Sequence, residues 1–464
     1  MKKITILTLI LGVSTCLSAC NSGATTTSSG QINNATMSTI ATTAQDYKGK
    51  LVLIGGAITD NNTQIYNAIA TETGKKTMPG NCSQDWSKTT CPKIAIVTSG
   101  AATSADGDDA YNNDVSSSAL SYEHLYQKYG FAVKHVSVNV DNYKVDTNPT
   151  SENGQLNKQI LEDADVVYFN GGDQARHARA WLNSDGSYNQ LLNVIAQRYR
   201  EDKLIVIGSS AGTAIQSNPT YGEGSSYGHL YFAKSNGLAS KLVSDGAIGG
   251  TGLKDTRADS SSLQYLDNGG KMPGFGFAPS NMLVDTHFDA RGRLARLIPA
   301  LYATAKNIGV GVDENTAFFI VDGEASVYGE HGVFIADNSQ ATRADDSNSF
   351  GVKNIKVNYL TSGDKYNLVS KAVTSNKSKI TSPYYSGYKD SSDITKAYET
   401  TSLITRLVDQ TGNDNIGKTA TPSDYPKSTT AFRLTFAKDS KTQGYYSSST
   451  KQYTVANAIV DINK

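Results

Sequence analysis

The chain has little of what marks a protein that binds nucleic acid, a nucleotide or a lipid bilayer. Among 464 residues, 43 Lys and Arg balance 43 Asp and Glu, and no basic run is present. Because nucleic-acid phosphates are bound through clustered cations, nucleic acid is excluded as a predicted partner. No dinucleotide fingerprint and no P-loop lysine follows an apolar run, which disfavours a nucleotide cofactor. Beyond the first twenty residues, no apolar run approaches the length of a membrane span.

The N-terminus has the layout of an export signal. Met1–Lys3 is a short basic head, Ile4–Val13 is mostly apolar, and Leu17-Ser18-Ala19-Cys20 follows. We therefore predict a signal peptide over residues 1–19. The small-residue site that ends in cysteine resembles the bacterial lipobox, which implies that Cys20 is acylated. The alternative is an ordinary signal peptide with a chance cysteine.

Acylation predicts a chain attached to the bacterial cell envelope, with the lipid as its link to the membrane. Asn21 in the second position, rather than Asp, favours the outer membrane, and extracellular release is the other outcome of export. Residues 20–48 are rich in Ser, Thr, Gly, Asn and Ala. Such a composition cannot bury enough apolar surface to fold, so we predict a tether there.

The chain has only four cysteines. Cys16 is lost with the signal and Cys20 is the predicted lipid site, which leaves Cys82 and Cys91. Two thiols so close together in an exported protein are expected to form a disulfide that staples a loop. A metal clip is the alternative, but no histidine or further cysteine is near enough in the sequence to complete the coordination. We therefore predict no metal and no cofactor.

From residue 49 onward, short apolar runs alternate with stretches of helical periodicity. The runs are Leu51–Ile54, Ile94–Val97, Val166–Phe169, Leu204–Ile207 and Ile308–Val312, and the helical stretches include Leu120–Tyr129, Leu191–Arg200 and Arg291–Ala305. This alternation predicts an α/β fold with a doubly wound parallel sheet. After about Thr316 the pattern turns to short β runs. We expect a main domain at residues 49–370 and an appended, mostly β segment at residues 371–464.

A five-residue motif offers a candidate nucleophile. Gly208-Ser209-Ser210-Ala211-Gly212 has the form G-x-S-x-G, follows a buried run, and precedes a stretch that looks helical. Glycines leave room for a sharp strand-to-helix turn that projects the Ser210 hydroxyl at the amino end of the helix. Ligands collect at the carboxyl ends of parallel strands, where this motif would lie. The alternative interpretation is a plain loop.

A serine nucleophile needs a base, and the chain has six histidines. His287 has the best placement, because it follows the apolar Met282–Val284 and precedes a helix, which predicts the same sheet edge as Ser210. His177, after a Gly-rich turn, is a competitor. The other four are expected on a solvated strand face (His135), in a helix (His124), in a loop (His229) and in a turn (His331).

An orienting carboxylate is expected from Asp313 or Glu314, which follow the run Ile308–Val312. The chain order is then serine, histidine, acid, whereas α/β-hydrolases have serine, acid, histidine. The order therefore argues against a lipase-like fold.

Three arginines stand close together after His287. Arg291, Arg293 and Arg296 are expected in the first turns of a helix, where a cation opposes the macrodipole at about 0.3–1 kcal/mol each. Two interpretations stay open on the residues alone. The arginines form a solvated basic face, or they form an anion clamp that binds substrate carboxylates beside the nucleophile.

Together these motifs resemble the cyanophycinase family, serine peptidases related to the aspartyl dipeptidase peptidase E. The matching pieces follow the family's order over roughly residues 50–370. They are Ile54-Gly55-Gly56, Gly171-Gly172-Asp173-Gln174, Gly208–Gly212, Asp285-Thr286-His287-Phe288 with the three arginines, and Gly311-Val312-Asp313-Glu314. The resemblance implies a class I glutamine amidotransferase-like, flavodoxin-like sheet for the domain at residues 49–370, which would be catalytic.

The resemblance also implies the roles of the residues. Ser210 would be the nucleophile, His287 the general base and then acid, and Glu314 the group that orients His287. Backbone N–H groups of Gly172 and Ala211 would form the oxyanion hole. The substrate pocket would be lined by Gln174, Asp285, Thr286, Arg291, Arg293 and Arg296, which tips the arginine question towards binding. The family hydrolyses cyanophycin, a poly-aspartate whose β-carboxyls carry arginine, to β-Asp-Arg, and its members are usually homodimers.

The sequence departs from the family in two places. Thr286 stands where cyanophycinases typically carry glutamine, and the residues after 370 and the lipid tether are additional. The first departure keeps a second substrate class open, namely isoaspartyl or other Asp-containing peptides. A non-catalytic, surface-binding lipoprotein is the alternative from a different class, and the intact Ser210, His287 and Glu314 argue against it.

Overall fold

The computed structural model describes residues 49–116, 119–183, 185–222, 224–233, 273–345, 349–421 and 431–463. The predicted signal peptide, lipid site Cys20 and tether lie outside these residues. Two sheets with helices between and around them make up the described part of the chain, so the predicted α/β class is confirmed.

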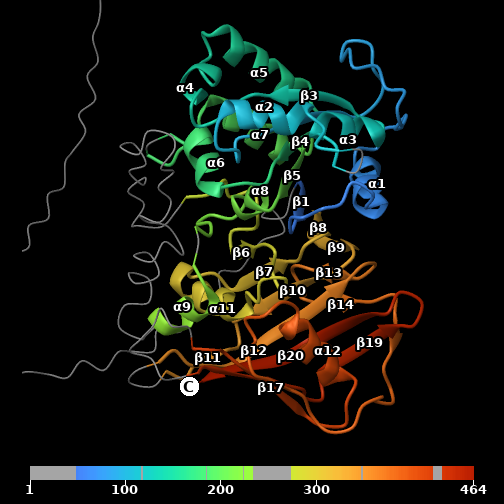
Figure 1. Cartoon of the computed structure of the whole chain (residues 1–464), viewed down its shortest axis with the longest axis vertical. Helices are drawn as coiled ribbons and strands as arrows, with labels where there is room; N and C mark the ends of the chain where they lie inside the picture. Colours follow the sequence, from blue (N-terminus) through green and yellow to red (C-terminus); the bar gives the residue numbers. More distant parts are fainter. Residues whose placement is uncertain are drawn as a thin grey trace, which may run out of the picture. The chain divides into compact units, whose positions relative to one another are not determined.

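The first sheet has a parallel half and an antiparallel half (Figure 1). Its strand order is β14-β13-β9-β8-β1-β5-β4-β2-β3. The parallel strands are β1 (Lys50–Ile54), β5 (Ile205–Ser209), β4 (Val166–Phe169), β2 (Lys93–Val97) and β3 (Ala132–Val136). The antiparallel strands are β8 (Thr316–Val321), β9 (Glu324–Gly329), β13 (Lys365–Asn367) and β14 (Val373–Thr374).

Both faces of the parallel half are buried under helices. Along β1, Leu51 and Leu53 join one hydrophobic cluster while Val52 and Ile54 join another, as the two-residue period of a strand requires. The first cluster takes in α5 (Glu152–Asp163), α6 (Gln174–Trp181) and α7 (Gln190–Arg200), and the second takes in α1 (Thr63–Glu72) and α3 (Tyr122–Lys128). Further helices in the described part of the chain are α2 (Ser104–Asn112), α4 (Tyr143–Asp146), α8 (Ala211–Ala214) and α9 (Ser226–Phe232).

The second sheet is mostly antiparallel and has the order β16-β17-β18-β20-β12-β10-β7-β6. Its strands are β6 (Met282–Asp285), β7 (Ile308–Val312), β10 (Gly332–Asp337), β12 (Val352–Thr361), β16 (Asp390–Ser391), β17 (Asp414–Lys418), β18 (Arg433–Ala437) and β20 (Gln452–Asn463). Three more strands join this sheet. Strand β11 (Thr342–Arg343) pairs with β12, β19 (Gln443–Ser447) pairs with β20, and β15 (Ser378–Lys379) pairs with β19. Helices α11 (Leu294–Thr304) and α12 (Glu399–Val408) share a hydrophobic cluster with this sheet.

Two expectations need correction. Ile308–Val312 was expected in the same parallel sheet as the run before Ser210, but β7 lies in the second sheet, parallel to β6 and antiparallel to β10. A strand that is buried on both faces has the same apolar pattern in either sheet, so the pattern alone does not indicate which sheet the strand joins. The helix expected at Arg291–Ala305 begins only at Leu294, and Arg291 precedes it.

The residues after 370 do not form a sheet of their own. Strands β17, β18 and β20 extend the sheet that contains β6 and β7, through the pairing of β20 with β12 (Figure 1). The predicted domain boundaries stay predictions, but strands from both sides of residue 370 share hydrogen bonds. No helix within the described residues combines the length and the apolar character that crossing a bilayer requires.

Candidate active site

Ser210 lies at the sharp turn between β5 and α8. Its backbone has φ 53° and ψ −112°, an unusual conformation for a residue with a side chain. The flanking glycines are required by close backbone contacts. A Cβ on Gly208 would lie 2.0 Å from the carbonyl oxygen of Gly212, and one on Gly212 would lie 2.1 Å from that of Phe169. The motif therefore forms a tight elbow that holds the serine out from the end of the strand.

The base and the carboxylate come from the second sheet. His287 follows β6 and Glu314 follows β7. The Nε2 of His287 is 2.7 Å from the Oγ of Ser210, and its Nδ1 is 2.8 Å from the Oε1 of Glu314. His177, the competitor, is instead fully buried, with its ring nitrogens on Ser99 Oγ (2.7 Å) and the Asn170 carbonyl (3.0 Å).

The end of β1 joins the two sheets at this point. The N–H of Ser210 donates to the Ile54 carbonyl (3.0 Å), and the N–H of His287 donates to the Gly55 carbonyl (2.9 Å). Gly55 has no space for a side chain, because a Cβ would lie 1.9 Å from the Asp313 carbonyl oxygen. A Cβ on Gly56, which has φ +105°, would lie 2.4 Å from the Cε1 of His287. The glycine pair thus lets the two sheets approach closely enough to complete the hydrogen-bonded chain.

The surroundings keep His287 a neutral base. Burial lowers its pKa below the ordinary value near 6.5, and the positive charges of Arg291 and Arg293 act in the same direction. The hydrogen bond to Glu314 opposes them without reversing the shift. At neutral pH the ring therefore has a free nitrogen lone pair, with which it can accept a proton from Ser210.

The predicted oxyanion-hole residues flank the nucleophile. Ala211 is the first residue of α8, so no earlier carbonyl within that helix can accept from its N–H. Gly172 has φ +134°, and a Cβ there would lie 2.1 Å from the Gly100 carbonyl oxygen, so the turn needs glycine. In the backbone hydrogen bonds outside helices and strands that join described residues, neither N–H is a donor. Their catalytic role stays a prediction.

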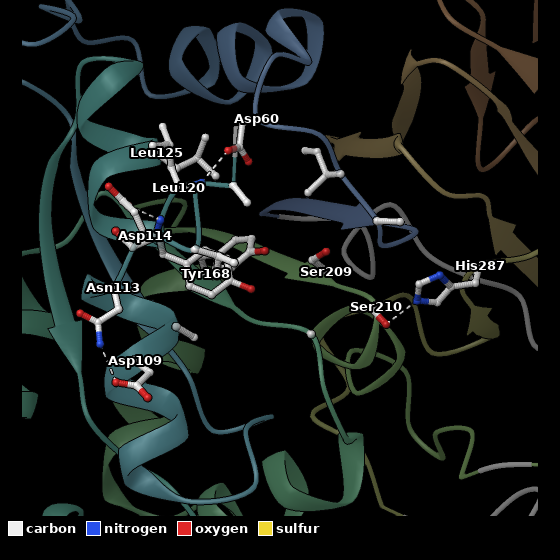
Figure 2. A pocket seen from close by; sticks show the side chains of 18 residues that line it. Asp60, Asp109, Asn113, Asp114, Leu120, Leu125, Tyr168, Ser209, Ser210 and His287 are labelled. Atoms are coloured by element: carbon white, nitrogen blue, oxygen red, sulfur yellow. Dashed lines mark hydrogen bonds between the residues drawn. The ribbon is translucent and has the colours of Figure 1, made fainter. Parts of the chain in front are cut away.

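A cavity of about 660 Å³ opens at Ser210 and His287. Figure 2 shows the Ser210–His287 pair on one side, Asp109, Asn113 and Asp114 on the other, and Tyr168 between them. The wall is acidic, because Asp60, Asp109 and Asp114 line it and no Lys or Arg does among its described residues. Asp60 accepts from the Leu120 N–H (2.7 Å), Asp109 from Asn113 (2.7 Å), and Asp114 from both Ser121 and His124.

Sequence reasoning missed these acidic residues. Asp109 and Asp114 belong to α2 and the loop after it, which follow the Ser99-Gly100 turn at the end of β2. The rule that ligands collect beyond the carboxyl ends of parallel strands applies to that turn as well, and it could have directed attention to them.

Two of the predicted substrate-binding residues neutralise each other. Asp285 is 1% exposed, and Arg296 holds both of its carboxylate oxygens, with Nε to Oδ2 at 2.7 Å. Arg296 also donates to the Gly224 carbonyl (2.7 Å) and lies over the ring of Tyr221. Burial opposes ionisation of Asp285, but the two guanidinium groups of Arg296 and Arg293 outweigh it and lower its pKa.

The three arginines are therefore not equivalent. Arg291 is exposed, and Arg293 is half-buried, with one N–H group on the Thr286 carbonyl (2.6 Å). Burial together with the neighbouring Arg296 lowers the pKa of Arg293 to about 10. Arg296 is the buried one and is engaged by Asp285. The three arginines therefore do not form one solvated basic face. If an anion clamp exists, Arg291 and Arg293 are the two arginines that could form it.

Gln174 and Thr286 are also engaged by the protein itself. The side-chain amide of Gln174 donates to the carbonyls of Tyr221 (2.9 Å) and Gly222, and Thr286 is 5% exposed. The described lining of the cavity at Ser210 includes none of the six residues predicted to bind substrate. Their role in binding stays a prediction.

Two of the other histidines were placed wrongly. His135 is not on a solvated face, since it contacts Thr98 (2.9 Å) and stacks on Tyr111, and burial lowers its pKa to about 4. His229 lies in α9 and is 1% exposed rather than in an open loop. Both side chains face inward because neighbouring helices cover them. The local sequence pattern does not indicate this packing.

The predicted disulfide between Cys82 and Cys91 is present and closes the loop before β2. Within the ranges that the structure describes, no group of three or more His, Cys, Asp or Glu side chains is arranged to hold a metal ion.

Curated cyanophycinases are similar to this chain. The cyanophycinase of Nostoc sp. is 30% identical over 222 residues, which cover 47% of this chain and 61% of that protein. The cyanophycinase of Synechococcus elongatus is 30% identical over 208 residues, which cover 44% and 52%. The chain thus spans less than two thirds of the length of these relatives. No protein-family model matches. Among solved structures, a peptidase from an acI-B1 Actinobacterium aligns with a TM-score of 0.39 and 16% identity, over 69% of this chain and 97% of that one, too low a similarity to support an argument.

Proposed function

We propose, from the similarity to curated cyanophycinases, that the chain is a member of their family and a serine peptidase that hydrolyses the backbone of cyanophycin to β-Asp-Arg. The observation that carries the proposal is the hydrogen-bonded chain from Ser210 Oγ through His287 to Glu314, at 2.7 and 2.8 Å. Both distances lie within the range of a strong hydrogen bond, and nucleophile, base and orienting acid occur in the order that proton transfer requires.

In the proposed mechanism, Ser210 Oγ attacks the scissile carbonyl while His287 Nε2 accepts the hydroxyl proton. The N–H groups of Gly172 and Ala211 stabilise the oxyanion that develops on the carbonyl oxygen. His287 then gives its proton to the leaving amine, and the C–N bond breaks to leave an acyl-enzyme. A water molecule then attacks the acyl-enzyme while His287 accepts its proton, and His287 returns this proton to Ser210 Oγ as the acyl group leaves. Glu314 accepts from the Nδ1–H throughout, which fixes the tautomer and stabilises the imidazolium.

The charge around Ser210 supports a substrate that carries both signs. The acidic cavity wall formed by Asp60, Asp109 and Asp114 would attract guanidinium groups, while Arg291 and Arg293, whose charges act on His287, would attract carboxylates. A poly-aspartate whose β-carboxyls carry arginine presents both groups, because each attached arginine has a guanidinium group and a free carboxylate. An isoaspartyl peptide presents only the carboxylates and is the second candidate substrate, kept open by Thr286.

Export by a signal peptide over residues 1–19 and attachment through lipid on Cys20 belong to the same proposal. An enzyme at the cell envelope would act on polymer released by other cells.

The test compares the chain without residues 1–20 with two single variants. Ser210→Ala removes the proposed nucleophile, and Ser209→Ala is the matched control, since it removes the same hydroxyl one residue away in β5. Each protein is incubated with insoluble cyanophycin granules and with isoaspartyl dipeptides, and soluble products are identified by mass spectrometry. The expected result is release of β-Asp-Arg by wild type and Ser209→Ala but not by Ser210→Ala.

Intact granules together with cleaved isoaspartyl dipeptides would replace the substrate by the second candidate. Cleavage that survives Ser210→Ala would overturn the mechanism. A fluorophosphonate probe adds a readout that needs no substrate. In that reaction Ser210 Oγ displaces fluoride from phosphorus and its proton passes to His287, so absence of labelling of the wild type would refute the proposed chemistry itself.

A further inference from the structure

The segment that leads into α12 packs against the loop that carries His287. The N–H of Tyr398 donates to the Asp289 carbonyl (2.8 Å), and the N–H of Thr401 donates to Asp289 Oδ2 (2.6 Å). The contact is close at Gly292 as well, where a Cβ would lie 2.3 Å from the carbonyl oxygen of Thr395. The loop of the candidate base is thus held by residues from the C-terminal part of the chain.

Tyr398 is also connected to the turn that carries Glu314. Its ring stacks on His331 with centroids 4.8 Å apart, and its hydroxyl lies 3.3 Å from the His331 Nε2. The N–H of His331 donates to the Oγ1 of Thr316 (2.9 Å), and this hydroxyl donates to the Glu314 carbonyl (2.9 Å). One side chain therefore links the two segments that carry the base and its carboxylate.

The backbone of Tyr398 is unfavourable by itself. It has φ 60° and ψ 15°, the left-handed region, at the N-cap of α12. For a residue with a Cβ this conformation costs about 1–2 kcal/mol, which glycine would avoid. Such a conformation persists only where the surroundings determine it, and here they direct the N–H to Asp289 and the ring to His331.

We propose that Tyr398 is a positioning residue for the His287–Glu314 pair, so that the part of the chain after residue 370 helps to complete the active site. The effect on catalysis rests on the proposed function, whereas the effect on the position of His287 does not. Tyr398 acts through Asp289 on the His287 loop and through His331 and Thr316 on Glu314. A base whose ring is misplaced by about 1 Å loses on the order of 100-fold in rate, so a partial loss of support has a measurable effect.

Three variants separate positioning from simple stabilisation. Tyr398→Gly removes the ring and keeps the N–H that donates to the Asp289 carbonyl. It also relieves the strain of the left-handed backbone conformation. Tyr398→Phe keeps the ring and is the conservative rescue. Lys451→Gly is the matched control, because Lys451 is exposed, has φ 59° and lies in the turn between β19 and β20.

Two readouts are compared with thermal unfolding. The first is the rate at which a fluorophosphonate labels Ser210. The second is the NMR signal of the His287 Nδ1–H and its pH titration. We expect Tyr398→Gly to unfold near the wild-type temperature but to react about 10-fold more slowly. Its His287 pKa should fall further, since the hydrogen bond to Glu314 raises that pKa while Arg291 and Arg293 lower it. Tyr398→Phe and Lys451→Gly should react within twofold of wild type.

A folded Tyr398→Gly with the wild-type labelling rate and an unchanged His287 signal would overturn the inference. A loss of rate in all three variants that follows their loss of thermal stability would overturn it too, because it would assign Tyr398 a structural role alone. If the wild type does not react with the probe, the proposed function fails, and the NMR comparison by itself decides whether Tyr398 positions His287.

Discussion

Gly56→Ala should disable the active site while leaving the fold intact. Gly56 follows β1 at the seam between the two sheets, and its missing side chain leaves the space that the imidazole of His287 occupies. An alanine Cβ would lie 2.4 Å from Cε1 and 2.5 Å from Nε2 of that ring. Carbon atoms in contact are normally about 3.5–4.0 Å apart, so the ring has to retreat by about 1 Å or more.

This retreat breaks the bond on which proton transfer depends. The Ser210 Oγ to His287 Nε2 distance of 2.7 Å would lengthen beyond about 3.5 Å, the limit of a useful hydrogen bond. General base catalysis contributes about 10²–10⁴-fold, and we expect a loss of this size in the rate of fluorophosphonate labelling. Gly56 also has φ +105°, so alanine adds backbone strain on the order of 1–3 kcal/mol to the free energy of unfolding.

The control separates strain from the collision. Gly74 has φ +66° and nothing within 4 Å of an ideal Cβ, so Gly74→Ala introduces left-handed strain without a steric contact. Urea unfolding and labelling rates are measured for both variants. Both should lose stability, and only Gly56→Ala should lose labelling. A Gly56→Ala protein whose labelling rate is within threefold of wild type would refute the reasoning. It would show that the ring of His287 can move and still keep its hydrogen bond to Ser210.

Three further predictions follow from buried charges. Burial raises the pKa of Asp289 to about 6, so its contribution to stability is complete below about pH 4 and is lost as the pH rises through 6. Asp289→Asn should therefore reduce the fall in unfolding free energy between pH 4.5 and pH 8 by on the order of 2–3 kcal/mol, and an unchanged fall in urea titrations would contradict this. Arg296→Met should cost about 3–5 kcal/mol, because it leaves Asp285 buried with its main partner removed, whereas the exposed Arg291→Met should cost under about 0.5 kcal/mol; equal losses in urea unfolding would argue against the ion pair. Labelling of Ser210 should decline at acid pH only below the ordinary histidine pKa of about 6.5, since burial lowers the pKa of His287, and a midpoint above 7 in the pH–rate profile would contradict the neutral base.

Much of the candidate site was predictable because it follows from short-range features. The Gly208–Gly212 elbow needs only glycines at two positions where backbone atoms approach a Cβ within about 2 Å. The Cys82–Cys91 disulfide joins residues that are close in the sequence. The turn residues after β1, β4 and β5 could be found from the apolar runs that precede them. Each of these features is determined within a single loop or element.

The less accurate expectations concerned long-range pairing. The run Ile308–Val312 has the same apolar pattern whichever sheet it joins, and only its hydrogen bonds with β6 and β10 place it in the second sheet. The burial of Arg296 and its ion pair with Asp285 could not be inferred locally, because Asp285 lies on β6 and Arg296 in α11. Tyr398 has no recognisable motif, and its contacts with Asp289 and His331 arise only when the segment before α12 packs on the loops that follow β6 and β9.

The sequence by itself determined that a serine stands on a glycine elbow at the end of a buried strand, with a histidine and a glutamate after two later strands. The tertiary structure decided that these strands belong to two different sheets, which the glycines after β1 allow to approach. It also decided which arginine is already neutralised and which tyrosine supports the base. The physical reason is that backbone geometry and burial of a strand are encoded in neighbouring residues. The partner of a buried charge or of an aromatic ring depends on which distant segments share a face, and no local pattern specifies that.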